Sequence, residues 1–221
     1  MEMSILCYNF DYMCFSASAS FTASAGLALI GTASLVVAKR EDKMLAFVPL
    51  AFAVQQGLEG MQWIALGNGS PSFIAGYGFL FFAFMLWPIY VPTFVFVLDK
   101  PRQAFLRYFM YVGIAVAAYF LALLITQPVS ISIANRCIDY HFANFPFRDL
   151  AVFSYILAII APFFLCDITA FKWFGYVIAA TALIAWLFFT LTFTSVWCFF
   201  AAVVSSLFFI YLWNKRSLAK S

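Results

Sequence analysis

One carboxyl group lies inside a long apolar segment of this sequence. Glu59 is the only acidic or basic residue in the stretch 44–66. Gln55, Glu59 and Gln62 are spaced i, i+4 and i+7, which places them on one face of a helix, whereas Gln56 is offset from that face by about 100°. Ionisable residues in apolar helices normally face the interior of a bundle and commonly bind protons, ions or substrates. The pattern therefore predicts a polar site around Glu59.

The charge state of Glu59 depends on its surroundings. Removal from water disfavours the ionised form of a carboxyl group, while Gln55 and Gln62 can donate hydrogen bonds but bring no charge. We expect a largely neutral Glu59 unless a cationic side chain reaches it from an external loop, where the candidates are Arg136, Arg148 and His141. The alternative role for a neutral Glu59 is structural, because hydrogen bonds between polar side chains hold membrane helices together.

The segment 127–148 contains a second group of reactive side chains. It holds the only histidine, His141, four residues after Cys137 and two after Asp139. On one helical turn, Cys137 and His141 could bind a metal ion if Glu59 or Cys14 supplied a third ligand. Cys14, Cys137 or Cys198 could instead pair with His141 as a catalytic nucleophile. Neither pattern is a recognised motif, so we predict no metal site and assign no cofactor.

The elements that carry these residues are apolar helices. The chain has 221 residues, of which 66% are hydrophobic and 10% charged, far from the roughly 25% charged residues of a soluble domain. A helix needs roughly 20 apolar residues to cross a bilayer. Seven segments meet that length: 19–38, 44–66, 73–98, 106–126, 149–166, 173–194 and 195–213. We therefore predict an all-α integral membrane protein with seven transmembrane helices; a reading with 173–213 as one re-entrant unit is the alternative.

The basic residues predict the orientation. Ten of the twelve Lys and Arg residues fall on one side of the seven-span topology, and only Arg136 and Arg148 fall on the other. Because cytoplasmic loops carry the excess of positive charge, we predict an N-terminus outside and a C-terminus inside. Glu59 follows Lys43 by 16 residues, which is about 24 Å of helix at about 1.5 Å per residue. It therefore lies in the outer half of the membrane.

This topology predicts three regions and gathers the candidate site residues. Residues 1–18 form an N-terminal extension and external segment, 19–213 a single transmembrane domain, and 214–221 a basic cytoplasmic tail. Segments expected to close the site around Glu59 contribute Cys14, His141, Arg148, Trp197 and Cys198. A disulfide from Cys137 to Cys14 or Cys7 is feasible if the outer compartment is oxidising.

Three stretches resemble a known family. They are Met13-Cys14-Phe15-Ser16-Ala17-Ser18-Ala19-Ser20-Phe21, Gln55-Gln56-x-x-Glu59-Gly60 and Ser195-Val196-Trp197-Cys198-Phe199-Phe200-Ala201-Ala202. Together they resemble an uncharacterised family of small bacterial multi-pass membrane proteins that begin Met-Cys-Phe-Ser-Ala. The resemblance implies a fold and a cytoplasmic-membrane location without an activity. It also implies that residues 1–12 precede the usual start at Met13.

Three functions fit these patterns. The first is binding or transport of a small or lipid-like molecule, with Glu59 as the proton- or cation-linked group. The second is an enzyme that uses Glu59 as acid or base with an external Cys or His, and the third is a structural or accessory subunit. The scattered basic residues argue against nucleic-acid binding, and 195–213 lacks the lysine that a retinal Schiff base requires. The partners we expect are the bilayer and a small hydrophobic ligand; protein partners are not predicted.

Overall fold

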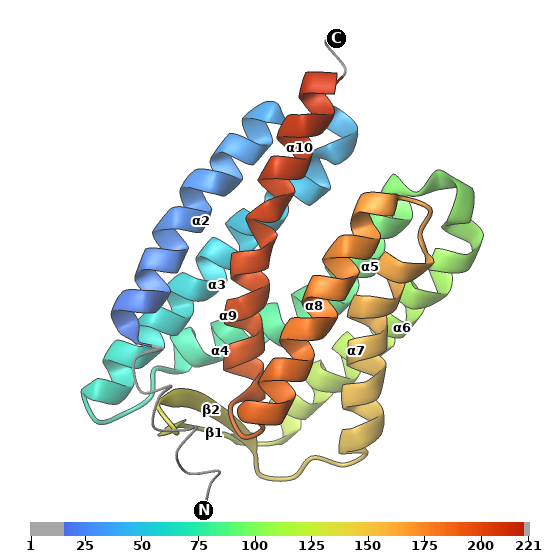
Figure 1. Cartoon of the computed structure of the whole chain (residues 1–221). Helices are drawn as coiled ribbons and strands as arrows, with labels where there is room; N and C mark the ends of the chain where they lie inside the picture. Colours follow the sequence, from blue (N-terminus) through green and yellow to red (C-terminus); the bar gives the residue numbers. More distant parts are fainter. Residues whose placement is uncertain (1–15, 219–221) are drawn as a thin grey trace, which may run out of the picture.

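A computed structural model describes residues 16–218 as a helical bundle closed at one end by a β-hairpin (Figure 1). Within these residues, seven helical segments are long and apolar enough to cross a membrane. Two 3-10 turns, η1 (Arg40–Asp42) and η3 (Lys100–Arg102), precede α3 and α6. The seven segments are α2 (Ala17–Val37), α3 (Lys43–Gly67), the composite of α4 (Phe73–Phe81), η2 (Phe82–Leu86) and α5 (Trp87–Leu98), α6 (Gln103–Thr126), α7 (Arg148–Leu165), α8 (Thr169–Phe188), and the pair α9 (Phe193–Ser205) and α10 (Leu207–Leu218).

Each segment predicted to span the membrane forms a helix, with ends shifted by a few residues. The largest differences are at the last two spans. α8 ends at Phe188, whereas the prediction continued to residue 194, and α10 continues to Leu218 beyond the predicted end at 213. The turn between α8 and α9 is tight, with the Thr192 amide donating to the Phe189 carbonyl at 3.0 Å. α8 and the pair α9 and α10 are each long and apolar enough to cross a membrane on their own, which favours two spans over one re-entrant unit.

The segment 127–148 contains a β-hairpin that sequence reasoning missed. β1 (Val129–Ala134) pairs with β2 (Cys137–Phe142) in antiparallel register. The two-residue turn places Asn135 and Arg136 at positive φ of 47° and 60°, the geometry that matches the twist of a tight hairpin. The helical turn expected for Cys137 and His141 is therefore wrong, because four residues of strand span about 13 Å.

The third span changes from α-helical to π-helical hydrogen bonding just before two prolines. In the π-helical segment η2, the amide of Trp87 donates to the carbonyl of Phe82, five residues earlier. With the same five-residue spacing, the Ala83 carbonyl would accept a hydrogen bond from the amide of residue 88. Residue 88 is a proline, which has no N–H to donate. The hydroxyl of Tyr155 on α7 donates to the Ala83 carbonyl instead, at 2.6 Å. The proline thus leaves an acceptor that fixes α7 against η2.

We call the end of the bundle with the hairpin the hairpin end, and the end with the C-terminus of α10 the tail end (Figure 1). Ion pairs join segments at the tail end. Lys215 on α10 reaches Asp42 at 2.7 Å, and Arg102 pairs with Asp167 at 2.8 Å. Asp42 is buried, so the first pair anchors α10 firmly beside the start of α3.

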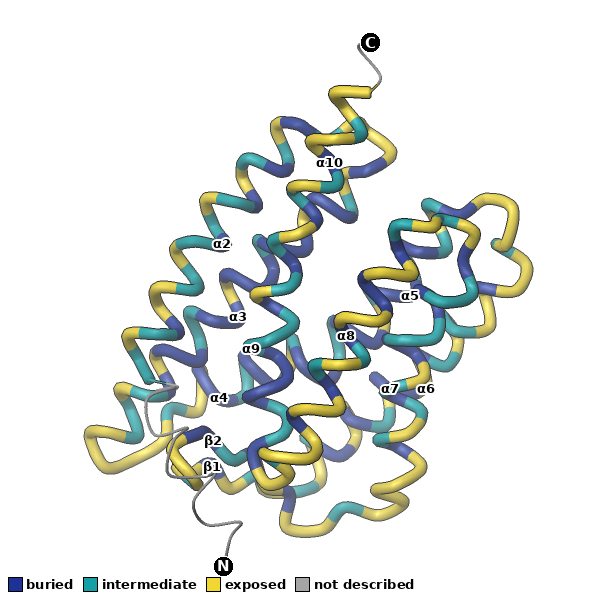
Figure 2. The backbone as a smooth tube through the Cα atoms, in the orientation of Figure 1, coloured by how far each residue is buried: buried dark blue, intermediate teal, exposed yellow. Residues whose placement is uncertain are grey.

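The outward faces of the helices are strongly apolar. Buried residues gather along the inner faces, while exposed positions follow the outer faces (Figure 2). Leu29 on α2 and Ile125 on α6 are each 75% exposed. An apolar outer surface distributed around the bundle is what a hydrocarbon environment requires. The exposed apolar side chains are thus consistent with a multi-pass membrane protein.

Candidate functional site

The carboxyl group of Glu59 is enclosed between α3 and α9 at the hairpin end. Its side chain is 2% exposed. The hydroxyl of Ser195, at the start of α9, donates a hydrogen bond to Oε1. The amide Nε2 of Gln56 donates to Oε2 at 3.1 Å. Both partners are neutral, and no ion pair involves Glu59 among residues 16–218. The bond from Ser195 ties α3 to α9, whereas the bond from Gln56 lies within α3.

The glutamines of α3 form a buried polar column beside Glu59. Gln55 accepts a hydrogen bond from the indole Nε1 of Trp87 at 2.7 Å. Gln62 accepts one from the backbone amide of Ser72 at 3.2 Å. These contacts attach α3 to α5 and to the N-terminus of α4. All three glutamines, including Gln56, are fully buried, because α3 is surrounded on most of its circumference at this height.

The hairpin covers the polar column. Ile138, Tyr140 and Phe142 alternate along β2 and are all buried. Burial raises the pKa of Tyr140 well above its ordinary value, and the nearby Glu59 carboxyl raises it further. The hydroxyl of Tyr140 makes no hydrogen bond. The hairpin therefore acts as a cover that holds a phenol close to Glu59 without direct bonding.

Cys137 at the start of β2 is a free, buried thiol. Burial raises its pKa to about 11, against the opposing effect of a hydrogen bond with Thr192. A catalytic cysteine needs a lowered pKa so that the thiolate is present near neutral pH. The surroundings of Cys137 produce the opposite change and do not support it as a nucleophile. Cys137 forms no disulfide with another cysteine of residues 16–218. Cys7 and Cys14 lie outside the described residues, so a disulfide from either of them to Cys137 stays a prediction.

The structure brings together part of the predicted residue set. Trp197 and Cys198 are buried at the hairpin end of α9, near the polar column. His141 and Arg148 are exposed, so neither shares the enclosed space of Glu59. Cys14 lies outside the described residues. Within residues 16–218, no group of three His, Cys, Asp or Glu side chains is placed to hold a metal ion.

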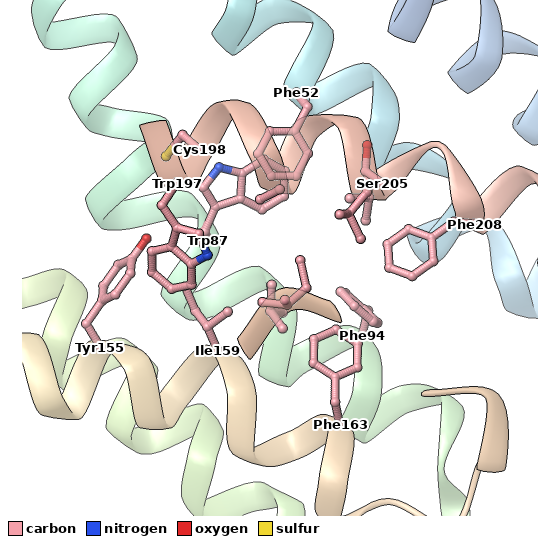
Figure 3. Close-up of a pocket in the computed structure, with 15 residues that line it drawn as sticks. Phe52, Trp87, Phe94, Tyr155, Ile159, Phe163, Trp197, Cys198, Ser205 and Phe208 are labelled. Atoms are coloured by element: carbon pink, nitrogen blue, oxygen red, sulfur yellow. The ribbon is translucent and has the colours of Figure 1, made fainter. Parts of the chain in front are cut away.

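An apolar pocket lies between the helices on the tail side of the polar column (Figure 3). About 560 Å³ of space lies between its walls, and this figure includes the open space at its mouth. The lining comes from six helices, α3, α5 and α7 to α10, and holds no charged side chain: Val48, Phe52, Trp87, Val91, Phe94, Tyr155, Ile159, Phe163, Ile178, Trp197, Cys198, Ala201, Val204, Ser205 and Phe208.

The pocket and the Glu59 site are neighbours but distinct. Glu59 and the glutamines are absent from the pocket wall. The indole of Trp87 separates the two spaces, since one face stacks on Phe52 with ring centroids 3.9 Å apart while its Nε1 donates to Gln55. A molecule in the pocket would therefore contact Trp87, Trp197 and Cys198 before it could reach Glu59.

Several residues of these two sites escaped sequence reasoning. Gln56 was set aside because it lies off the stripe of Gln55 and Glu59, yet it bonds Glu59 directly. Ser195 lies in one of the stretches that resemble the family but was not predicted as a site residue, and Tyr140 and Tyr155 carry no distinctive pattern in the sequence. The hairpin did have a signal, because Val129, Ile131 and Ile133 alternate with Ser130 and Ser132, the period of a β-strand.

A comparison with models of known protein families identifies the family of this chain. The model of a family of unknown function, DUF6629, matches residues 13–221. The chain belongs to this family. The match covers nearly the whole sequence and begins at Met13, which agrees with the resemblance noted above. Comparisons with curated proteins and with solved structures gave no match. The function of this family is unknown, so a proposal about the function of this chain has to rest on the geometry of its site.

Proposed function

We propose that this protein binds a small apolar or lipid-like molecule within the membrane. The observation that carries the proposal is the uncharged, aromatic-lined pocket between six helices. Pockets lined mainly by apolar and aromatic side chains are typical ligand sites. Its position inside a bundle with an apolar outer surface favours a ligand that partitions into the bilayer.

The polar column around Glu59 has a supporting role in this proposal. Its hydrogen bonds join α3 to α9 and α5, the helices that form one end of the pocket. Because Glu59 has neutral partners and does not line the pocket, it fixes the shape of the pocket rather than meeting the ligand first. A role for Glu59 in proton- or cation-linked transport would need a rearrangement at Trp87.

Ligand binding can be measured through the two tryptophans of the pocket. In a background with the other four tryptophans changed to phenylalanine, a brominated alkane is expected to quench Trp87 and Trp197 saturably in nanodiscs. Ala201→Phe fills the pocket from α9 and should weaken the apparent affinity by about tenfold or more, equivalent to about 1.4 kcal/mol. Fluorescence titration at fixed lipid content provides the measurement.

Val203→Phe is the matched control, because Val203 lies on the same helix but is 51% exposed on the outer face. Its fluorescence titration should give the same apparent affinity as that of the parent protein. Quenching that rises linearly without saturation in all three proteins would contradict a defined binding site.

We further propose that the chain spans the cytoplasmic membrane with the hairpin end outside. The unequal distribution of Lys and Arg supports this orientation, since loops rich in these residues share the tail end. A reporter fused after Lys220 is expected to be cytoplasmic, and one inserted at Asn68-Gly69, in the exposed turn after α3, to be external. Paired phosphatase and fluorescent-protein fusions measure both positions. An external C-terminus would overturn the orientation.

A further inference from the structure

The hairpin end of the pocket contains one indole N–H without a partner. Trp197 lines the pocket and is 5% exposed, and its Nε1 forms no hydrogen bond with any of residues 16–218. In Figure 3 its ring lies beside Tyr155, with the nitrogen on the side away from that residue. Burying a donor without an acceptor is unfavourable, because the hydrogen bond it made with water is not replaced. Such a group in a pocket wall indicates a partner supplied by the ligand.

The other polar groups of the wall are already engaged. The indole N–H of Trp87 donates to Gln55, the hydroxyl of Tyr155 to the Ala83 carbonyl, and the hydroxyl of Ser205 to the Ala202 carbonyl. Apart from the weak thiol donor of Cys198, Trp197 is therefore the single side-chain donor in the pocket wall that remains available. Indole donates and cannot accept a hydrogen bond, so only an acceptor on the ligand can satisfy it.

A second unpaired donor lies just behind this point. The Gln55 amide is next to the Cys198 sulfur, and its Nε2 has no hydrogen bond of normal geometry. Gln55 lies outside the pocket wall, so Trp197 Nε1 is the N–H donor that a ligand in the pocket meets first. No Lys, Arg or His lines the pocket, and burial of a carboxylate without a cation is strongly unfavourable. The acceptor therefore has to be neutral.

We infer that the ligand is an apolar molecule with a neutral carbonyl-type oxygen at one end, which accepts a hydrogen bond from Trp197 Nε1. This inference rests on the proposed ligand-binding function and specifies the ligand class. The apolar remainder of the molecule lies along Val91, Phe94 and Phe163 toward Phe208. Long-chain ketones, quinones and esters have this form, whereas free fatty acids and plain alkanes do not.

The test uses three probes with the same carbon skeleton: tridecane, 2-tridecanone and tridecanoic acid. Each competes with the brominated alkane for quenching of Trp87 and Trp197. The ketone should displace the quencher at a concentration about five- to tenfold lower than the alkane, the gain expected from one hydrogen bond. The ionised acid should compete no better than the alkane.

Trp197→Phe keeps an aromatic ring and removes the donor, with Trp87 as the remaining reporter. The advantage of the ketone over the alkane should disappear in this variant while the alkane still competes. Infrared spectra of 2-tridecanone labelled with ¹³C at the carbonyl give a second measurement that needs no substitution. The carbonyl band should shift to lower frequency in the presence of the unmodified protein, relative to lipid alone.

The outcomes separate the two proposals. Equal competition by ketone and alkane, or a ketone advantage that survives Trp197→Phe, overturns the carbonyl inference and leaves the apolar pocket standing. Stronger competition by the acid overturns the neutral character of the acceptor. Failure of every probe to displace the quencher overturns the ligand-binding function itself.

Discussion

Gly113→Ala is expected to destabilise the fold by about 3 kcal/mol, near the upper end of the usual cost of overpacking. A Cβ atom at Gly113 on α6 would lie 1.8 Å from the carbonyl oxygen of Pro88 on α5. That carbonyl has no helical donor because residue 92, four positions later, is also a proline. The two backbones pack at the distance that glycine permits, and a backbone atom cannot rotate away as a side chain can.

The measurement is the midpoint of thermal unfolding in detergent micelles. By the scaling of soluble domains of this size, the midpoint should fall by about 6–12 °C. Gly26→Ala is the control, since a Cβ atom there meets nothing within 4 Å. Alanine favours helix over glycine by about 1 kcal/mol, so this variant should be neutral or slightly more stable. Equal midpoints for both variants would contradict the close contact of α5 and α6.

Glu59→Leu is expected to lower the free energy of unfolding by about 2–5 kcal/mol. Leucine leaves the Ser195 hydroxyl and the Gln56 amide without their shared acceptor inside the bundle, and each buried unpaired donor costs about 1–3 kcal/mol. Glu59→Gln should lower the free energy of unfolding much less than Glu59→Leu does. Its amide oxygen can accept from Ser195, and its NH₂ group can donate to the Oε1 of Gln56, which has no partner in the native protein.

Thermal unfolding of both variants tests this prediction, with Met61→Leu as control on the outer face of α3, where Met61 is 49% exposed. A double-mutant cycle with Ser195→Ala should give a coupling energy of about 1 kcal/mol between the two positions. A Glu59→Leu protein as stable as the parent would show that the carboxyl does not lock the helices. Ligand binding lost in Glu59→Gln with unchanged stability would instead favour a direct role in function.

The protonation state of Glu59 stays a prediction from its surroundings. An infrared carboxyl band near neutral pH that is lost in Glu59→Gln would identify the neutral form expected from burial. The structure argues against the alternative, an ionised Glu59 paired with a cation. Arg148 and His141 are exposed, and no ion pair to Glu59 occurs among the described residues. Arg136 is exposed as well, so among residues 16–218 a cation could reach this carboxyl only after a structural change at the hairpin end.

The sequence alone determined the seven helices and the burial of Glu59. Both follow from local composition, since a run of about 20 apolar residues has to satisfy its own backbone hydrogen bonds in lipid. The i, i+4, i+7 spacing likewise placed Gln55, Glu59 and Gln62 on a common buried side of α3. These features depend on helix periodicity and length, which can be counted along the chain.

Only the tertiary structure decided the partners of those residues. Ser195 bonds Glu59 across 136 positions of sequence, and Trp87 bonds Gln55 across 32. Such pairs depend on the rotation and spacing of whole helices, which is set by close contacts such as that of Gly113 with Pro88. The pocket has the same origin, because its wall draws on six helices. A cavity forms where the surfaces of packed helices do not touch one another, so it cannot be recognised from any single segment of the sequence.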